Sequence, residues 1–130
     1  MIIPHLHFCG DCTDAIAVYE KAFKTTADKE RIVFTADGTT ISHAVMQIHG
    51  QTVFLNDNFG NKNRTSDFAV HLILTFDTAA ELLTCYDILR ADDNEPPPFV
   101  ETPYSELTGN FMDKFGVMWG FMVAGRYNFN

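Results

Sequence analysis

Short apolar runs and helical spacings follow one another in the same order twice along the chain. Residues 2–9 and 69–76 are short, mostly apolar stretches that predict one strand each. Residues 12–24 and 78–90 follow them, with apolar residues recurring at intervals of three and four, which is typical of an amphipathic helix. Three more strand-like runs, bounded by turn residues, come after each helix. The pattern therefore predicts the order β-α-β-β-β twice.

An internal repeat supports this interpretation. A shift of 66 positions lays the second half over the first without a gap, so that His71 falls on His5 and Gly116 falls on Gly50. When the two halves are instead aligned through their helices, the first-strand counterpart of His71 shifts by one residue, from His5 to Pro4. Sparse matches in one register over most of each half indicate two copies of a single module.

The expected fold class is α+β, with both modules in one domain over residues 1–130. Module one takes 1–58, a polar linker 59–67, and module two 68–125.

The helix starts carry capping signals. Asp11 and Asp77 are natural N-caps, and the sequence TAAE at 78–81 has the form of a capping box.

Alternation along the strands separates two faces of each sheet. In the first strand Leu6 and Phe8 share one face, and His5, His7 and Cys9 share the other. Because the apolar faces are expected to pack on the helices, the face that carries His5, His7 and Cys9 is expected to line a cleft. The same rule places three further groups on cleft-facing positions: Thr52, Phe54 and Asn56; His71, Ile73 and Thr75; Met118, Gly120 and Met122. Their alternates, including Trp119, Phe121 and Val123, are expected in the core.

Composition and charge narrow the class of protein. The chain has 130 residues, 46% of them apolar, which is enough for one folded domain and excludes a disordered chain. The 17 acidic and 9 basic residues give a formal charge of −8, which argues against nucleic acid or an anionic membrane as partner. No apolar run approaches the roughly 20 residues of a membrane span. An odd number of cysteines and no leader sequence at the start predict a cytoplasmic protein with reduced thiols.

Three stretches resemble one family in combination. FCGDCTDAIAVYEKAF, ISHAVMQIHGQTVFLND and MDKFGVMWG are similar to segments of the PhnB-like branch of the vicinal oxygen chelate superfamily. This superfamily includes glyoxalase I, bleomycin-resistance proteins and fosfomycin-resistance enzymes. The resemblance implies sheets that curve around a ligand or metal, a small-molecule ligand and a homodimer. Tyr104-Ser105 departs from it, since such proteins often carry Trp-Gly there.

The resemblance also defines where a divalent metal would bind. Relatives that use a metal take ligands from the first and fifth strands, here His5 and His71, and a carboxylate four residues after the hairpin glycine. That position is Gly120 in the second module and Phe54 in the first, and neither side chain binds a metal. Two histidines fall short of the three protein ligands that a catalytic centre usually has. His7, Asn56 or Asp57 would have to supply the third.

Three interpretations follow. The favoured one is a PhnB-like protein that binds a small organic molecule in a cleft between the modules, without a standard catalytic metal centre. The alternative is a metal-dependent lyase, isomerase or transferase of the glyoxalase or fosfomycin-resistance type. The third is a thiol-redox protein that uses Cys9 and Cys12, a C-x-x-C pair at a helix start. The candidate cleft residues are His5, His7, Phe54, Asn56, His71, Met118, Gly120 and Met122.

No spacing singles out a catalytic residue. His43 in the third strand and the acidic Glu101 and Glu106 are the nearest candidates for a general base, and His43 is equally suited to a structural role. The sequence leaves open the ligand and whether any reaction is catalysed.

Overall fold

Each half of the chain folds as a β-α-β-β-β module, which confirms the predicted α+β class. The computed structural model describes residues 1–57, 70–92 and 96–126, and it forms two compact units, Met1–Thr65 and Ser66–Asn130. The predicted linker at 59–67 lies outside the described residues.

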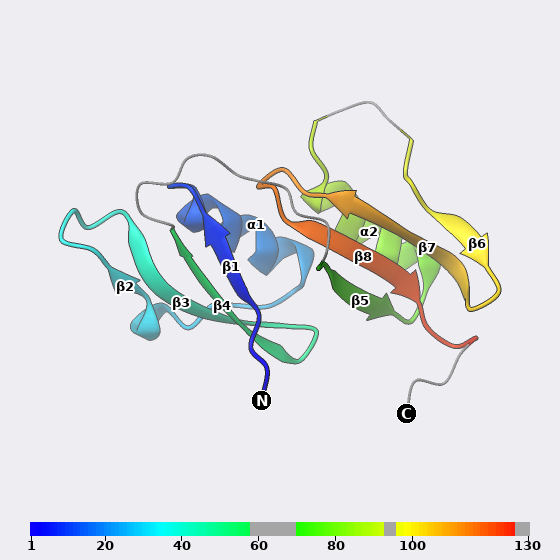
Figure 1. Ribbon diagram of the computed structural model, residues 1–130, viewed down its shortest axis with the longest axis horizontal. Helices are drawn as coiled ribbons and strands as arrows, with labels where there is room; N and C mark the ends of the chain where they lie inside the picture. Colours follow the sequence, from blue (N-terminus) through cyan, green and yellow to red (C-terminus); the bar gives the residue numbers. More distant parts are fainter. Residues whose placement is uncertain (58–69, 93–95, 127–130) are drawn as a thin grey trace. The chain divides into compact units, whose positions relative to one another are not determined.

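The first unit is a four-stranded sheet with one helix on it. Its sheet order is β1-β4-β3-β2, with β1 parallel to β4 and the other pairs antiparallel (Figure 1). The elements are β1 (His5–Phe8), α1 (Cys12–Ala22), the 3-10 turn η1 (Lys29–Arg31), β2 (Val33–Phe34), β3 (Ile41–Ile48) and β4 (Gln51–Asp57).

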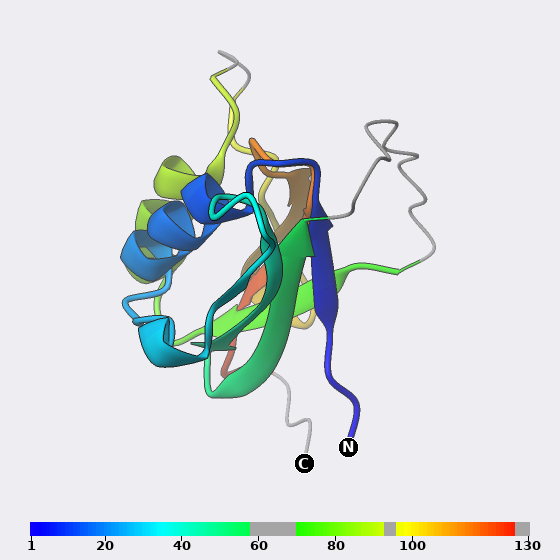
Figure 2. The ribbon, with the colours of Figure 1, turned by 90° about the vertical axis from the view of Figure 1, so that its left-hand side faces the viewer.

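Helix α1 covers one face of this sheet, as the side view in Figure 2 shows. Its buried side chains include Ile16 and Tyr19, and the Tyr19 ring centroid lies 6.1 Å from that of Phe8 on β1. Alternate residues of β3 and β4 complete this core: Ala44, Met46, Ile48, Val53 and Leu55. The alternate positions of the same strands therefore point away from the helix.

The second unit repeats the arrangement with the sheet order β5-β8-β7-β6 (Figure 1). Its elements are β5 (Leu72–Phe76), α2 (Ala79–Leu89), β6 (Val100–Thr102), β7 (Ser105–Met112) and β8 (Met118–Val123). The predicted core side chains Trp119, Phe121 and Val123 are buried. Edge-to-face ring contacts link Tyr86 and Phe111 at 4.9 Å and Phe111 and Phe121 at 4.9 Å, so aromatic packing dominates this core.

A buried carboxylate holds the start of α1. Asp57 Oδ1 accepts hydrogen bonds from the backbone N–H groups of Gly10 and Cys12, at 2.8 and 3.1 Å, and its Oδ2 accepts one from Ile41 at 3.0 Å. Asp11 occupies the N-cap position, yet its side chain makes no cap hydrogen bond. The cap predicted for Asp11 is therefore supplied by the end of β4, far along the chain.

A second buried carboxylate shapes the turn between β7 and β8. Asp113 Oδ1 accepts from the N–H groups of Phe115 and Val117, both at 2.9 Å. Its Oδ2 accepts from Trp119 Nε1 at 2.8 Å. The conspicuous DKFGVMW segment is thus a structural turn that anchors the buried indole.

Helix α2 begins one residue later than predicted. Thr78 is its N-cap, and its Oγ1 accepts from the N–H of Glu81 at 3.2 Å, so the prediction of Asp77 as N-cap is wrong. The TAAE segment does supply the cap through its threonine.

Strand pairing corrects the repeat register. Phe54 and Gly120 are 66 positions apart, as predicted, but Phe54 pairs with His5 whereas Gly120 pairs with Ile73. His5 and Ile73 are 68 positions apart (73 − 5), so His71 is not the structural counterpart of His5. The gapless alignment is wrong over the first strand of each module.

Differences in loop length explain the shift. Three residues (9–11) join β1 to α1, whereas two (77–78) join β5 to α2. The helix starts, Cys12 and Ala79, are consequently 67 positions apart (79 − 12). The separation between equivalent residues of the two modules thus falls in steps, from 68 in the first strand to 67 at the helix start and 66 in the last strand. Sparse sequence identities do not reveal these steps.

The backbone conformation at the end of α1 can be tested by substitution. Lys24 has φ of 53°, and the N–H of Thr25 closes the helix on Glu20 O at 3.1 Å, which is the arrangement of a left-handed helix end. We expect Lys24→Gly to raise the free energy of unfolding by about 0.5–1 kcal/mol, because glycine adopts this conformation without steric strain. The measurement is urea unfolding followed by circular dichroism.

Arg90 is the matched control, since it ends α2 with φ of −61°. Arg90→Gly should lower stability, because it frees the unfolded chain and also removes the contacts of the Arg90 side chain with Asp87 and Ala91. A lower unfolding midpoint for Lys24→Gly would contradict the assignment.

Candidate functional site

Four of the predicted cleft residues lie together on the face of the first sheet that is opposite α1. Strands β1 and β4 are parallel neighbours, with His5 paired to Phe54 and His7 paired to Asn56. Side chains at paired positions project to the same side of a sheet. The sheet register therefore brings these two pairs next to each other.

A third histidine joins them from β3. The His43 ring contacts Phe54 edge-on, with centroids 4.8 Å apart, and His5 contacts Phe54 edge-on from the other side at 6.0 Å. The His5 and His7 rings are 4.3 Å apart. We call this group of five residues, His5, His7, His43, Phe54 and Asn56, the histidine face.

His43 is the member that sequence reasoning left undecided. The alternation of β3 contains the signal, because Ala44, Met46 and Ile48 are buried while His43 and Val45 are only partly buried. What the sequence lacks is the pairing of β3 with β4, which sets His43 beside Phe54.

One hydrogen bond orders the edge of this face. His7 Nδ1 lies 2.7 Å from Asn56 Oδ1. Since a carbonyl oxygen only accepts, the imidazole donates through Nδ1–H.

The histidine face favours uncharged imidazole at His5. The pKa of His5 is lowered from its ordinary value, first because burial disfavours the charged form and then because His7 and His43 would repel that charge. Among the residues of β1 to β4 the only carboxylate is Asp57, which is buried at the start of α1. No acidic side chain of these strands therefore shares the face with the histidines.

In the second unit the structure brings His71 close to Gly120. A Cβ placed on Gly120 would lie 3.0 Å from His71 Cδ2, from Ile73 Cγ1 and from Asn110 Oδ1. Three side chains thus close over this glycine. Of the other two candidates on β8, Met122 is buried and Met118 is partly buried.

The donor set does not fit a three-ligand metal centre. Gly120 offers no ligand atom, and a side chain there would press on His71, Ile73 and Asn110, which would have to shift by a few tenths of an ångström. In the part of the chain that the structure describes, no three His, Cys, Asp or Glu side chains are grouped to hold a metal ion. We therefore derive no chemical step through a metal.

The C-x-x-C pair does not have the properties of a redox dithiol. Cys12 is fully buried, and burial raises the pKa of its thiol to about 12, with Asp57 and Asp11 adding to the effect. Redox-active thiols in this position have a lowered pKa, because the thiolate is the reactive form. Cys12 is a packing residue, and Cys9 is partly buried and forms no disulfide.

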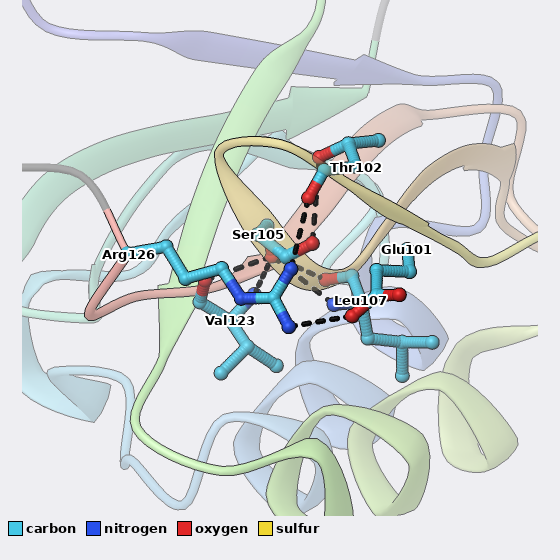
Figure 3. A network of polar contacts seen from close by, with 6 residues as sticks. All are labelled: Glu101, Thr102, Ser105, Leu107, Val123 and Arg126. Atoms are coloured by element: carbon cyan, nitrogen blue, oxygen red, sulfur yellow. Dashed lines mark hydrogen bonds and ion pairs between the residues drawn. The ribbon is translucent and has the colours of Figure 1, made fainter.

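Glu101, one of the acidic candidates, belongs to a surface ion pair. Arg126 contacts the Glu101 carboxylate at 2.5 Å and donates to the backbone oxygen of Thr102 at 3.1 Å (Figure 3). This arrangement ties the segment after β8 to β6.

Ser105 is the structural centre of the same network (Figure 3). Its buried Oγ accepts from the N–H of Val123 at 3.1 Å and from that of Leu107 at 3.2 Å, and it donates to Val123 O at 2.8 Å. The departure from the family pattern at Tyr104-Ser105 thus introduces a hydroxyl that fastens β7 to β8.

The chain matches a family model described as the Glyoxalase/Bleomycin resistance protein/Dioxygenase superfamily over residues 2–121. It belongs to this superfamily. The resemblance to its PhnB-like branch is confirmed by a solved structure described as a putative 3-demethylubiquinone-9 3-methyltransferase, PhnB protein, from Bacillus cereus. That structure has a TM-score of 0.74 and 27% identity, covering 95% of this chain and 98% of the other.

Two further proteins are similar to this chain. Protein YjdN of Escherichia coli strain K12 is 26% identical over 89% of this chain and 90% of its own length. Protein PA1353 from Pseudomonas aeruginosa has a TM-score of 0.78 and 22% identity, over 95% of this chain and 97% of the other. Among the described residues, no helix of this superfamily member is long and apolar enough to cross a membrane.

The raised pKa of Cys12 predicts a loss of stability at alkaline pH. An unfolded cysteine loses its proton near pH 9, whereas folded Cys12 keeps it up to about pH 12. Between these values the unfolded state binds fewer protons, so the free energy of unfolding should fall by up to about 1.4 kcal/mol per pH unit. Urea unfolding between pH 8 and pH 11 measures this slope.

Cys12→Ala provides the comparison, because lysine and tyrosine titration is common to both proteins. The variant is expected to be less stable at pH 7 but to lose less stability as pH rises. Parallel curves for the two proteins would contradict the assignment.

Proposed function

We propose that this superfamily member binds a small organic molecule on the histidine face. The observation that carries the proposal is the position of Phe54, with His5 and His43 edge-on at either side. Binding sites for small molecules typically combine apolar or aromatic surface with a few polar groups that fix orientation. The histidine face has this composition on a rigid, hydrogen-bonded sheet.

The neutral state of His5 suits an uncharged organic ligand. A neutral imidazole offers one N–H donor and one nitrogen acceptor. No carboxylate from β1 to β4 faces the histidines, so these strands provide no acidic partner for them in acid–base chemistry. The proposal is therefore binding, and it includes no reaction and no standard catalytic metal centre.

The metal-dependent alternative rests on the second unit. There His71 lies beside Gly120, the position at which metal-using relatives carry a carboxylate. A lyase, isomerase or transferase mechanism would require at least one further ligand.

We also propose a homodimer in the cytoplasm. Each four-stranded sheet has two edge strands, β1 and β2 or β5 and β6, and edges of this kind are commonly covered by association. Cys9, Cys12 and Cys85 form no disulfide, which is compatible with a reducing compartment. Analytical ultracentrifugation measures the oligomeric state directly.

Truncating Phe54 tests the binding site. Aromatic fragments screened by ligand-observed NMR should bind, and Phe54→Ala should weaken their binding about threefold to tenfold, because an aromatic pair contributes about 0.5–1.5 kcal/mol. Tyr104→Ala removes an exposed ring of the second unit and should leave affinity unchanged. Equal affinities for wild type and Phe54→Ala would contradict the assignment of this face.

Metal analysis tests the alternative. Protein purified after growth with zinc, manganese and nickel is expected to retain much less than one metal ion per chain. Stoichiometric metal that is lost in His71→Ala would favour the metal-dependent enzyme and overturn the metal-free proposal. His49→Asn is the control, because His49 lies at the β3–β4 turn and asparagine tolerates its φ of 49°.

A further inference from the structure

His7 differs from the other two histidines of the histidine face in having a fixed hydrogen-bond partner. Its Nδ1 lies 2.7 Å from Asn56 Oδ1, and the two residues are register partners on β1 and β4. No hydrogen bond within the described residues fixes the rings of His5 and His43, which contact their neighbours through ring faces and edges.

The partner decides which nitrogen of His7 carries the proton. An amide oxygen has no hydrogen to give, so Nδ1 is the protonated nitrogen and Nε2 keeps a lone pair. Nε2 lies on the opposite side of the ring from this bond, and the His7 side chain is exposed. With Asn56 Oδ1 on Nδ1, neutral His7 therefore presents a hydrogen-bond acceptor at Nε2, and it presents a donor there only if the Asn56 amide turns its Nδ2 toward Nδ1.

A fixed acceptor selects among ligands. A molecule that covers His7 without offering a donor removes Nε2 from water and leaves it without a hydrogen bond, which is unfavourable. His5 and His43 impose no such requirement, because each can present either its donor or its acceptor.

We infer that the ligand of the histidine face has a flat aromatic body that contacts Phe54 and a hydroxyl or N–H group that donates to His7 Nε2. Asn56 is the positioning residue, since it acts on the ligand only through His7. This inference deepens the proposed function and depends on it for the statement about the ligand, whereas the tautomer of His7 is testable without any ligand.

The tautomer is measured by long-range 1H–15N correlation spectra of histidine-labelled protein at alkaline pH, where imidazoles are neutral. Wild-type His7 is expected in the Nδ1–H form, and Asn56→Leu should shift it towards the Nε2–H form. His43 serves as the internal control, because its spectrum should be the same in both proteins. A wild-type His7 in the Nε2–H form would overturn the inference.

Ligand selection is tested with indole and benzofuran, which have nearly the same shape but differ in a ring N–H against a ring oxygen. Indole should bind wild type about threefold to tenfold more tightly, the ratio expected for one net hydrogen bond. The preference should disappear in Asn56→Leu and in His7→Phe. It should persist in His49→Asn.

The outcomes separate the two proposals. Equal affinity of wild type for indole and benzofuran overturns the donor requirement and leaves the proposed binding face standing. Failure of both to bind, together with every other aromatic fragment, contradicts the proposed function. In that case the spectrum of His7 still decides the tautomer.

Discussion

Burial of one face of each sheet beneath a single helix is the constraint on which the rest of the structure depends. Helix α1 packs on alternate side chains of β1, β3 and β4 and forms the core of the first unit with them. Helix α2 packs in the same way on the sheet of the second unit. Because strand side chains alternate, this packing leaves the other positions on the opposite face. The histidine face is thus a consequence of where the apolar residues must go.

Much of this was predictable from the sequence. Alternation in HLHF placed His5 and His7 opposite Phe8, and helical spacing located both helices within one to two residues. Local rules were weaker at the helix starts, where Asp57 caps α1 from a distant strand and Thr78 takes the place expected for Asp77. A cap from across the sheet requires the fold to be known first.

The predicted alignment of the two modules was wrong over their first strands for a related reason. The 66-residue alignment is correct for β4 and β8, which follow the hairpin glycines. The connections on either side of the helices differ in length between the modules, so His71 is not the counterpart of His5. The ring contact of His43 on β3 with Phe54 on β4 likewise follows from strand pairing, which no residue pattern encodes. Such features depend on contacts between residues distant in sequence.

The histidine face and the surroundings of Gly120 indicate different chemistry. On the first sheet, imidazoles surround a phenyl ring and one of them is oriented by an amide. On the second, three side chains close over the glycine at which a metal ligand would stand in metal-using relatives. The balance of these observations favours recognition of an organic molecule over metal chemistry.

A crystal structure of the protein soaked with a mixture of aromatic fragments tests this account most directly. We predict a fragment against Phe54 with its donor group on His7 Nε2. Fragments bound elsewhere, with the histidine face empty, would contradict it.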